Sequence, residues 1–178
     1  MVLSIDASTP PELLPLAWLI GRWEGAGVVG HPTRGEDVRF GQEVEFSTDG
    51  RPFLHYTSRM WRLDESGTPQ EPLDAETGYW RPTGPPVQQP GAAGPAGVGL
   101  EVLLAHPTGV VEVYVGTAKG PRIDVSTDVV ARTAGAAEYT AGQRMYGLVE
   151  GDLLWALDVS AGGHPLQSYA SARLKRVG

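Results

Sequence analysis

Hydrophobic and polar residues alternate with a period of two along most of the chain, after one short segment with a different spacing. Between positions 10 and 20 the apolar residues recur at helical spacing, and two prolines at the beginning of this segment suit a helix start. From position 38 onward, apolar residues alternate with charged or polar neighbours, as in EDVRFGQEVEFS. Because successive side chains of a strand point to opposite faces of a sheet, this pattern predicts half-buried strands.

The alternating pattern recurs often enough to predict about ten strands. Gly-, Pro- and Asp-rich links separate them, which is typical of antiparallel hairpins. Asp49-Gly50 predicts a two-residue hairpin, and Gly41 predicts a bulge or bend within its strand. We therefore expect an all-β fold, a ten-stranded antiparallel up-and-down β-barrel with a short N-terminal helix, with a β-sandwich as the alternative. The predicted strands are residues 22–29, 38–46, 52–63, 76–81, 98–105, 110–117, 123–131, 138–148, 153–160 and 166–175.

The length of 178 residues fits a single domain that covers residues 1–178. The 24 glycines and 15 prolines favour short strands and many turns over long helices. Residues 1–10 are predicted to be an N-terminal tail. Residues 82–99, PTGPPVQQPGAAGPAGVG, contain almost nothing to bury, and we expect a flexible insertion between two paired strands.

Composition argues against several kinds of chemistry and partner. The net charge of −7 and the scattered Lys and Arg residues argue against nucleic acid, and the absence of Cys removes disulfides, thiolate metal sites and Cys nucleophiles. No segment approaches the ~20 apolar residues of a membrane span, so we expect a cytoplasmic protein with no membrane partner. No GxSxG, HExxH or phosphate-binding glycine loop is present, and the motifs alone indicate neither an enzyme nor a metal site.

A motif of glycines around one tryptophan follows the predicted helix. Gly21, Trp23, Gly25 and Gly27 form the pattern GxWxGxG. We expect Trp23 to fill one end of the barrel, and the glycines to let the first strand bend and approach other backbone closely.

Together with later segments, this motif resembles the nitrobindin family, small haem-binding barrels related in fold to fatty-acid-binding proteins and lipocalins. The resemblance covers nearly the whole chain apart from the insertion. It implies a ten-stranded barrel with ferric haem in its mouth, coordinated by one His on the last strand, and an association with nitric oxide and with isomerisation of peroxynitrite to nitrate. The matching segments are HPT at 31–33, RPFLHYTSR at 51–59, ETGYWR at 76–81, LLAHPTGVVEVYVGT at 103–117 and GHPLQSYASARLKRV at 163–177.

The chain departs from the family at the iron ligand. Tyr169 stands where the resemblance places the axial His, and Ala137 stands where haem-binding relatives have a Lys near the haem. Imidazole binds ferric and ferrous iron, whereas a phenol must ionise first and then favours ferric iron. A nearby positive group would help, but Arg173 lies roughly 13 Å along the strand. We therefore expect that His-ligated haem has been lost and that no cofactor is resident. Haem b is the alternative that the family implies, with Tyr169 or, less favourably, His164 as ligand.

Three functions stay open at this point. The first is a nitrobindin-like pocket protein with an unknown small ligand. The second is a ferric haem protein that acts on peroxynitrite or nitric oxide, in which case the chain would be a peroxynitrite isomerase. The third is a binder of a small apolar or fatty-acid-like molecule whose head group would meet Arg173, Tyr169 and Ser171, which share strand parity. We expect a monomer or a homodimer.

Two further residues are predicted to line the pocket. Thr33 belongs to the HPT segment, and His55 is the His that lies within a predicted strand and could face the cavity. His106, in the segment His-Pro-Thr-Gly, is interpreted as fixing its turn through a hydrogen bond.

Overall fold

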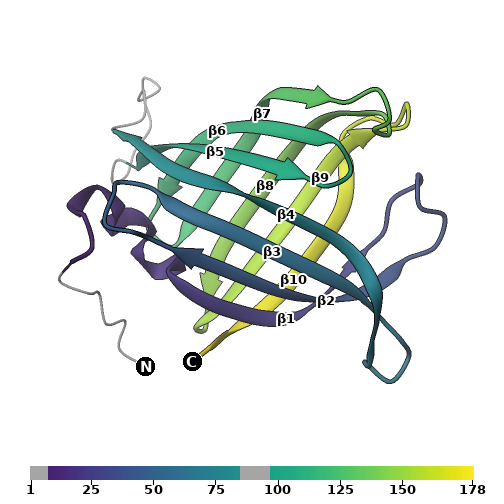
Figure 1. The fold of residues 1–178 in the computed structure, drawn as a ribbon, viewed down its shortest axis with the longest axis horizontal. Coiled ribbons are helices and arrows are strands. Elements are labelled where there is room, and N and C mark those ends of the chain that lie inside the picture. Colours follow the sequence, from purple (N-terminus) through teal and green to yellow (C-terminus); the bar gives the residue numbers. More distant parts are fainter. Residues whose placement is uncertain (1–7, 85–96) are drawn as a thin grey trace.

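Ten antiparallel strands follow one short helix in the residues that this computed structural model describes, 8–84 and 97–178. Each strand pairs with the next one along the chain, and the first strand pairs with the last, which closes the barrel (Figure 1). The predicted up-and-down barrel is therefore confirmed, and a sandwich is excluded. The elements are η1 (Pro11–Leu19), β1 (Gly21–Val29), β2 (Val38–Ser47), β3 (Leu54–Leu63), β4 (Pro69–Gly84), β5 (Val98–His106), β6 (Val110–Lys119), β7 (Arg122–Arg132), β8 (Tyr139–Val149), β9 (Asp152–Ala161) and β10 (Gln167–Val177).

Helix η1 packs three of its four leucines into one end of the barrel. Leu13, Leu16 and Leu19 are fully buried in the core. The segment is a 3-10 helix, and it contains Pro15, which has no N–H to donate inside an α-helix. Among the described residues, no helix is long and apolar enough to cross a membrane.

Trp23 fills this end of the barrel, as predicted. Its side chain is fully buried, and its indole Nε1 donates a hydrogen bond to the carbonyl of Leu19 at 2.8 Å. The guanidinium of Arg176 lies 4.1 Å from the centre of the ring and donates to the carbonyls of Trp18 and Ile20. These contacts fix the helix against the first and last strands.

The glycines of the motif allow β1 to approach β10 closely. A Cβ on Gly25 would lie 2.8 Å from the Cα of Leu174, and a Cβ on Gly27 would lie 2.7 Å from the Cβ of Ala172. Both distances are too short for a real side chain. The predicted close backbone approach is therefore present at these two positions.

Two local predictions were wrong in detail. The dipeptide Asp49-Gly50 lies within the longer link 48–53, where the carboxylate of Asp49 accepts a hydrogen bond from the backbone N–H of Arg51. Gly41 does not mark a bulge, because β2 pairs in continuous register with both neighbours there. Gly41 instead leaves room for the indole of Trp61, whose Cε2 would lie 2.7 Å from an added Cβ.

Strand β4 is longer than predicted, and the insertion is correspondingly shorter. Pairing with β3 extends β4 back to Pro69, and pairing with β5 extends it forward to Gly84. Pairing with β3 and β5 thus includes in β4 several Pro and Gly residues whose intrinsic strand preference is low. Positions 82–84 and 98–99 of the predicted insertion belong to strands, and residues 85–96 lie outside the described residues. Of the predicted tail, residues 1–7 also lie outside them.

Candidate functional site

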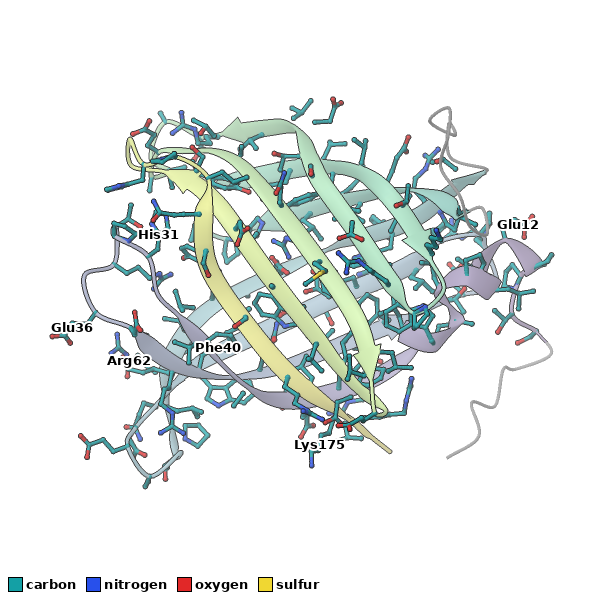
Figure 2. The ribbon with its side chains drawn as sticks, turned by 180° about the vertical axis from the view of Figure 1, so that it is seen from behind. Glu12, His31, Glu36, Phe40, Arg62 and Lys175 are labelled. Atoms are coloured by element: carbon teal, nitrogen blue, oxygen red, sulfur yellow. The ribbon has the colours of Figure 1, made fainter. Side chains whose placement is uncertain are left out.

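A cavity of about 340 Å³ lies at the end of the barrel opposite helix η1. Figure 2 shows His31, in the loop between β1 and β2, at the far end of the barrel from Glu12 of η1. The rim carries residues of this loop and of the links that follow β5, β7 and β9. A cavity of this size with a mostly apolar wall suits a small, largely apolar molecule. The apolar wall includes Val29, Met60, Leu73, Val110, Leu157 and Val159.

Tyr169 reaches this cavity because β10 contains a bulge. Ser168 pairs with Asp158 of β9, whereas Ala170 pairs with the adjacent Leu157, so Tyr169 is an extra residue in the ladder. As a result Tyr169 and Ala170, although consecutive, both line the cavity. The bulge therefore aims the phenol of Tyr169 at the site.

The same bulge reverses the strand parity that we used to place Ser171 and Arg173. Both residues are exposed on the outer wall, and Arg173 pairs there with Asp152 at 2.6 Å and with Glu150 at 3.3 Å. Their predicted place in the pocket is wrong, because one extra residue moves every later side chain to the opposite face. The predicted head-group site at Arg173 is therefore excluded.

The positive group beside Tyr169 comes from the loop between β1 and β2. Arg34 Nε donates a hydrogen bond to the Tyr169 hydroxyl at 2.9 Å, and the guanidinium carbon lies 5.4 Å from the ring centre. The backbone N–H of Gly30 donates to the carbonyl of Tyr169 at 2.8 Å. His31 packs its ring 5.6 Å from the Tyr169 ring, and its Nδ1 lies 2.8 Å from the hydroxyl of Thr33, which also lines the cavity.

The other sequence candidates have different surroundings. His164 packs edge-on against His31, with ring centres 5.8 Å apart, and does not line the cavity. Ala137 lies on the rim and brings no charge. The predicted inward position of His55 is wrong, because Leu54 and Tyr56 take the inner face of β3 and leave His55 exposed. Burial and the nearby His164 lower the pKa of His31 below its usual value.

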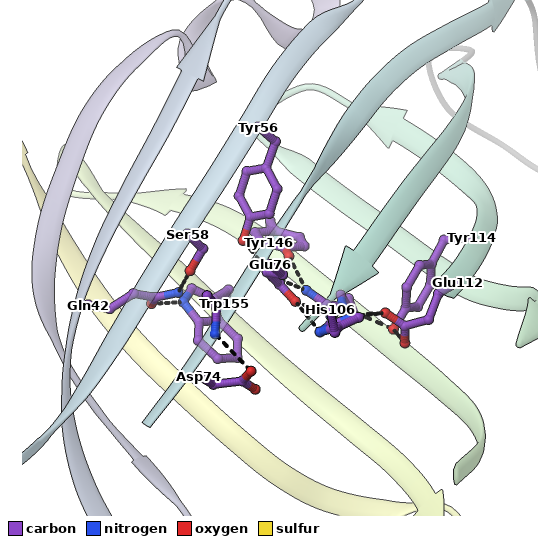
Figure 3. Close-up of polar contacts among 12 residues, drawn as sticks. Gln42, Tyr56, Ser58, Asp74, Glu76, His106, Glu112, Tyr114, Tyr146 and Trp155 are labelled. Atoms are coloured by element: carbon purple, nitrogen blue, oxygen red, sulfur yellow. Dashed lines mark hydrogen bonds and ion pairs between the residues drawn. The ribbon is translucent and has the colours of Figure 1, made fainter. Parts of the chain in front are cut away.

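Three buried charged side chains and the partly exposed His106 also line the cavity, and we call Glu76, His106, Glu112 and Arg144 the charged cluster. Arg144 of β8 reaches Glu76 of β4 through two hydrogen bonds, of 2.7 and 2.8 Å. His106 Nε2 lies 2.6 Å from Glu112 and its Nδ1 lies 3.6 Å from Glu76 (Figure 3). A hydrogen bond of His106 does fix the turn, but it is accepted by the backbone carbonyl, from the N–H of Gly109 at 3.1 Å, while the side chain points to Glu112 inside the barrel.

The members of the charged cluster shift one another's pKa values. Burial alone would raise the pKa of Glu112, but the hydrogen bond to His106 and the charges of Arg144 and His106 lower it to about 2. Burial alone would lower the pKa of His106, but the hydrogen bond to Glu112 and the charge of Glu76 raise it above its usual value. Burial opposes ionisation of Glu76 as well, yet the charge of Arg144 holds its pKa below the usual value. Glu76 and Glu112 thus face Arg144 and, when it is protonated, His106.

Sequence reasoning missed Arg34 and the charged cluster. The Arg34 contact spans 135 positions and the Arg144 to Glu76 contact spans 68, so neither produces a local motif. A signal was present for the charged cluster, because Arg144 shares its strand face with Tyr146, and Glu112 shares one with Tyr114. A charge on an otherwise apolar strand face indicates a buried partner.

The comparisons with known proteins agree with the fold and the cavity. Residues 12–176 match the family described as "THAP4-like, heme-binding beta-barrel domain". A ferric nitrobindin-like protein of Kineococcus radiotolerans is 70% identical over 99% of both chains, and a peroxynitrite isomerase of Parafrankia sp. is 49% identical over 93% of this chain and 80% of the relative. The crystal structure of Rv2717c from M. tuberculosis has 33% identity and a TM-score of 0.78, covering 96% of this chain and 99% of that one. The chain belongs to the nitrobindin family of haem-binding β-barrels.

Proposed function

We propose that this chain binds ferric haem and that the phenol oxygen of Tyr169, in place of a His, is the iron ligand. The observation that carries the proposal is the setting of this oxygen, which faces the cavity from a bulge and accepts a hydrogen bond from Arg34 at 2.9 Å. A phenol binds iron as its anion and favours the ferric state. A guanidinium beside that oxygen stabilises the anion through a charge-assisted hydrogen bond. This pair of groups therefore fits a ferric haem.

The four histidines, all within the described residues, offer no comparable ligand. His31 and His164 do not line the cavity, and His55 is exposed on the outer wall. His106 does line the cavity, but its Nε2 lies 2.6 Å from Glu112. Binding iron through that nitrogen would break a buried ion pair and leave the carboxylate uncompensated.

The other tyrosines of the cavity are poorer candidates than Tyr169 for the iron ligand. Tyr56 donates its hydroxyl hydrogen bond to Glu76 at 2.6 Å, and Tyr139 donates its own to Glu112. Loss of either proton would place a phenolate against a carboxylate, and burial raises the pKa of both phenols. Tyr146 accepts a hydrogen bond from Arg144 at 3.3 Å, but burial raises the pKa of its phenol and Arg144 is already paired with Glu76. The Tyr169 oxygen instead faces Arg34, which makes no ion pair within 4 Å in the described part of the chain.

Peroxynitrite is the substrate that we propose to test, because relatives that match nearly the whole chain are named peroxynitrite isomerases. A bound ferric haem would supply a Lewis-acidic iron. Tyr169 would hold that iron through its phenolate oxygen, and Arg34 would balance the negative charge of that oxygen. The apolar wall would exclude water. The members of the charged cluster are already paired with one another.

A free fatty acid is a poorer candidate ligand. Arg173 lies on the outer wall, and the buried Arg144 already makes two hydrogen bonds to Glu76 and lies 3.5 Å from Glu112. A carboxylate beside Arg144 would therefore meet a cation that is already paired, and burying an unpaired charge is costly. A head group would have to bind Arg34 on the rim, where the guanidinium already donates to Tyr169.

The proposal is tested by titrating the purified apoprotein with ferric haem and following the absorbance spectrum. Tyr169→Phe and Tyr169→His are titrated beside the parent, with Tyr79→Phe as the control, since Tyr79 is half exposed on the outer wall. We expect saturable binding by the parent and by Tyr79→Phe, and a much weaker association with Tyr169→Phe.

Two results would count against the proposal. Equal binding by the parent and Tyr169→Phe would remove Tyr169 as the ligand. Binding by Tyr169→His alone would mean that the barrel keeps a haem-sized cavity without a working ligand, and the search would turn to another small molecule. The enzymatic part fails separately if peroxynitrite decays no faster with the loaded protein than with free haem.

A further inference from the structure

Arg34 is held in place by a loop that is anchored to Tyr169 itself. The backbone N–H of Gly30 donates to the Tyr169 carbonyl at 2.8 Å, and the N–H of Arg34 closes a turn onto the carbonyl of His31, also at 2.8 Å. The ring of His31, which is 5% exposed, packs against the phenol ring. The loop and the bulge of β10 therefore form one unit that holds the guanidinium against the phenol oxygen.

In the described part of the chain, Arg34 makes no ion pair within 4 Å, although Asp74 lines the same cavity and feels the charge of Arg34. Arg144 and Arg173 each form ion pairs with carboxylates, but Arg34 forms none. The polar partner of its guanidinium is the Tyr169 hydroxyl, at 2.9 Å. The arrangement is therefore suited to a negative charge on that oxygen.

We propose that Arg34 makes the cavity select trivalent metalloporphyrins over divalent and metal-free ones. The inference rests on the proposed role of Tyr169 as the ligand. A porphyrin dianion leaves one positive charge on a trivalent metal, which a phenolate neutralises, and leaves none on a divalent metal. Arg34 stabilises the phenolate that only the trivalent complex needs, so it is a positioning residue for the ligand and acts through Tyr169.

The competing role for Arg34 is an ion pair with the carboxylates on the edge of the porphyrin. Those carboxylates are the same whether the porphyrin carries a trivalent metal, a divalent metal or no metal. A carboxylate role therefore changes the affinity for every porphyrin alike, whereas a role through the phenolate changes it only for trivalent complexes. The charge of the metal therefore distinguishes the two roles of Arg34.

The experiment measures dissociation constants for four probes: ferric, Ga(III), Zn(II) and metal-free protoporphyrin IX. The parent is compared with Arg34→Gln, Arg34→Lys and Tyr169→Phe, and with Arg173→Gln as the control, which removes one arginine charge from the outer wall. We expect Arg34→Gln to weaken binding of the ferric and Ga(III) probes about tenfold to hundredfold, the effect of losing one charge-assisted hydrogen bond. Binding of the Zn(II) and metal-free probes should not change.

Two further results would support the inference. Arg34→Lys should recover part of the affinity for trivalent probes, because an ammonium group also donates and carries charge. The ferric Soret band of Arg34→Gln should shift toward that of Tyr169→Phe, which a purely structural role for Arg34 would not produce.

The inference and the proposed function fail in different ways. If Tyr169→Phe loses the trivalent probes while Arg34→Gln keeps them, the inference is wrong and the ligand assignment stands. If Arg34→Gln weakens all four probes equally, Arg34 serves the porphyrin edge and the inference is again wrong. If Tyr169→Phe binds ferric and Ga(III) probes as well as the parent does, both are wrong.

Discussion

Removal of Arg144 should destabilise the barrel far more than removal of an arginine from its outer wall. The Arg144 side chain is 4% exposed and donates to Glu76 at 2.7 and 2.8 Å and to the hydroxyl of Tyr114 at 3.0 Å. Arg144→Met keeps much of the volume and removes all of these bonds. It leaves Glu76 buried without its main cation, and breaking a buried ion pair in this way costs about 3–5 kcal/mol. A domain is typically stable by only about 5–15 kcal/mol.

Urea unfolding of the parent and variants measures this cost directly. Arg173→Met is the matched control, because Arg173 also pairs with two carboxylates but its side chain is 51% exposed, and we expect a much smaller loss of stability than for Arg144→Met. The double variant Glu76→Gln with Arg144→Met should cost less than the sum of the two single changes, since the orphaned charge is absent. A loss for Arg144→Met no larger than that for Arg173→Met, with an unchanged m-value, would refute this reasoning.

The pKa of His106 is raised above 6.5 in the fold, so its stabilising contribution is complete below that pH and is lost as pH rises through the raised value. Urea unfolding at increasing pH should show this loss in the parent but not in His106→Gln. The pKa of Glu112 is lowered from 4.5 to about 2, so about 3 kcal/mol should disappear as pH falls between these values, and Glu112→Gln should flatten acid unfolding. Gly25→Ala forces a methyl group against the backbone of β10 and should cost about 1–3 kcal/mol in thermal or urea unfolding. Gln42→Leu removes the acceptor of the buried Trp155 indole N–H, at 2.8 Å, and should cost about 1–3 kcal/mol, and an unchanged midpoint would contradict this.

The local sequence pattern was sufficient to predict the strands that form the wall of the barrel. It was insufficient to predict which side chains meet inside it. Alternation along each strand predicted which segments pair, and Asp49-Gly50 pointed to the right hairpin although the link is longer. The same alternation misplaced Ser171 and Arg173, because Tyr169 occupies a bulge that the neighbouring residue types do not predict. A parity argument holds only up to the next bulge.

By itself, the sequence determined the all-β class, the order of the strands and the place of Trp23 at one barrel end. These features depend on side-chain alternation, turn residues and motif spacing, which are all local. Only the tertiary structure decided that Arg34 meets the Tyr169 oxygen and that Arg144 meets Glu76 across the barrel. Closure of the sheet brings together residues far apart in the chain, and their pairing depends on the register and bulges of every strand between them.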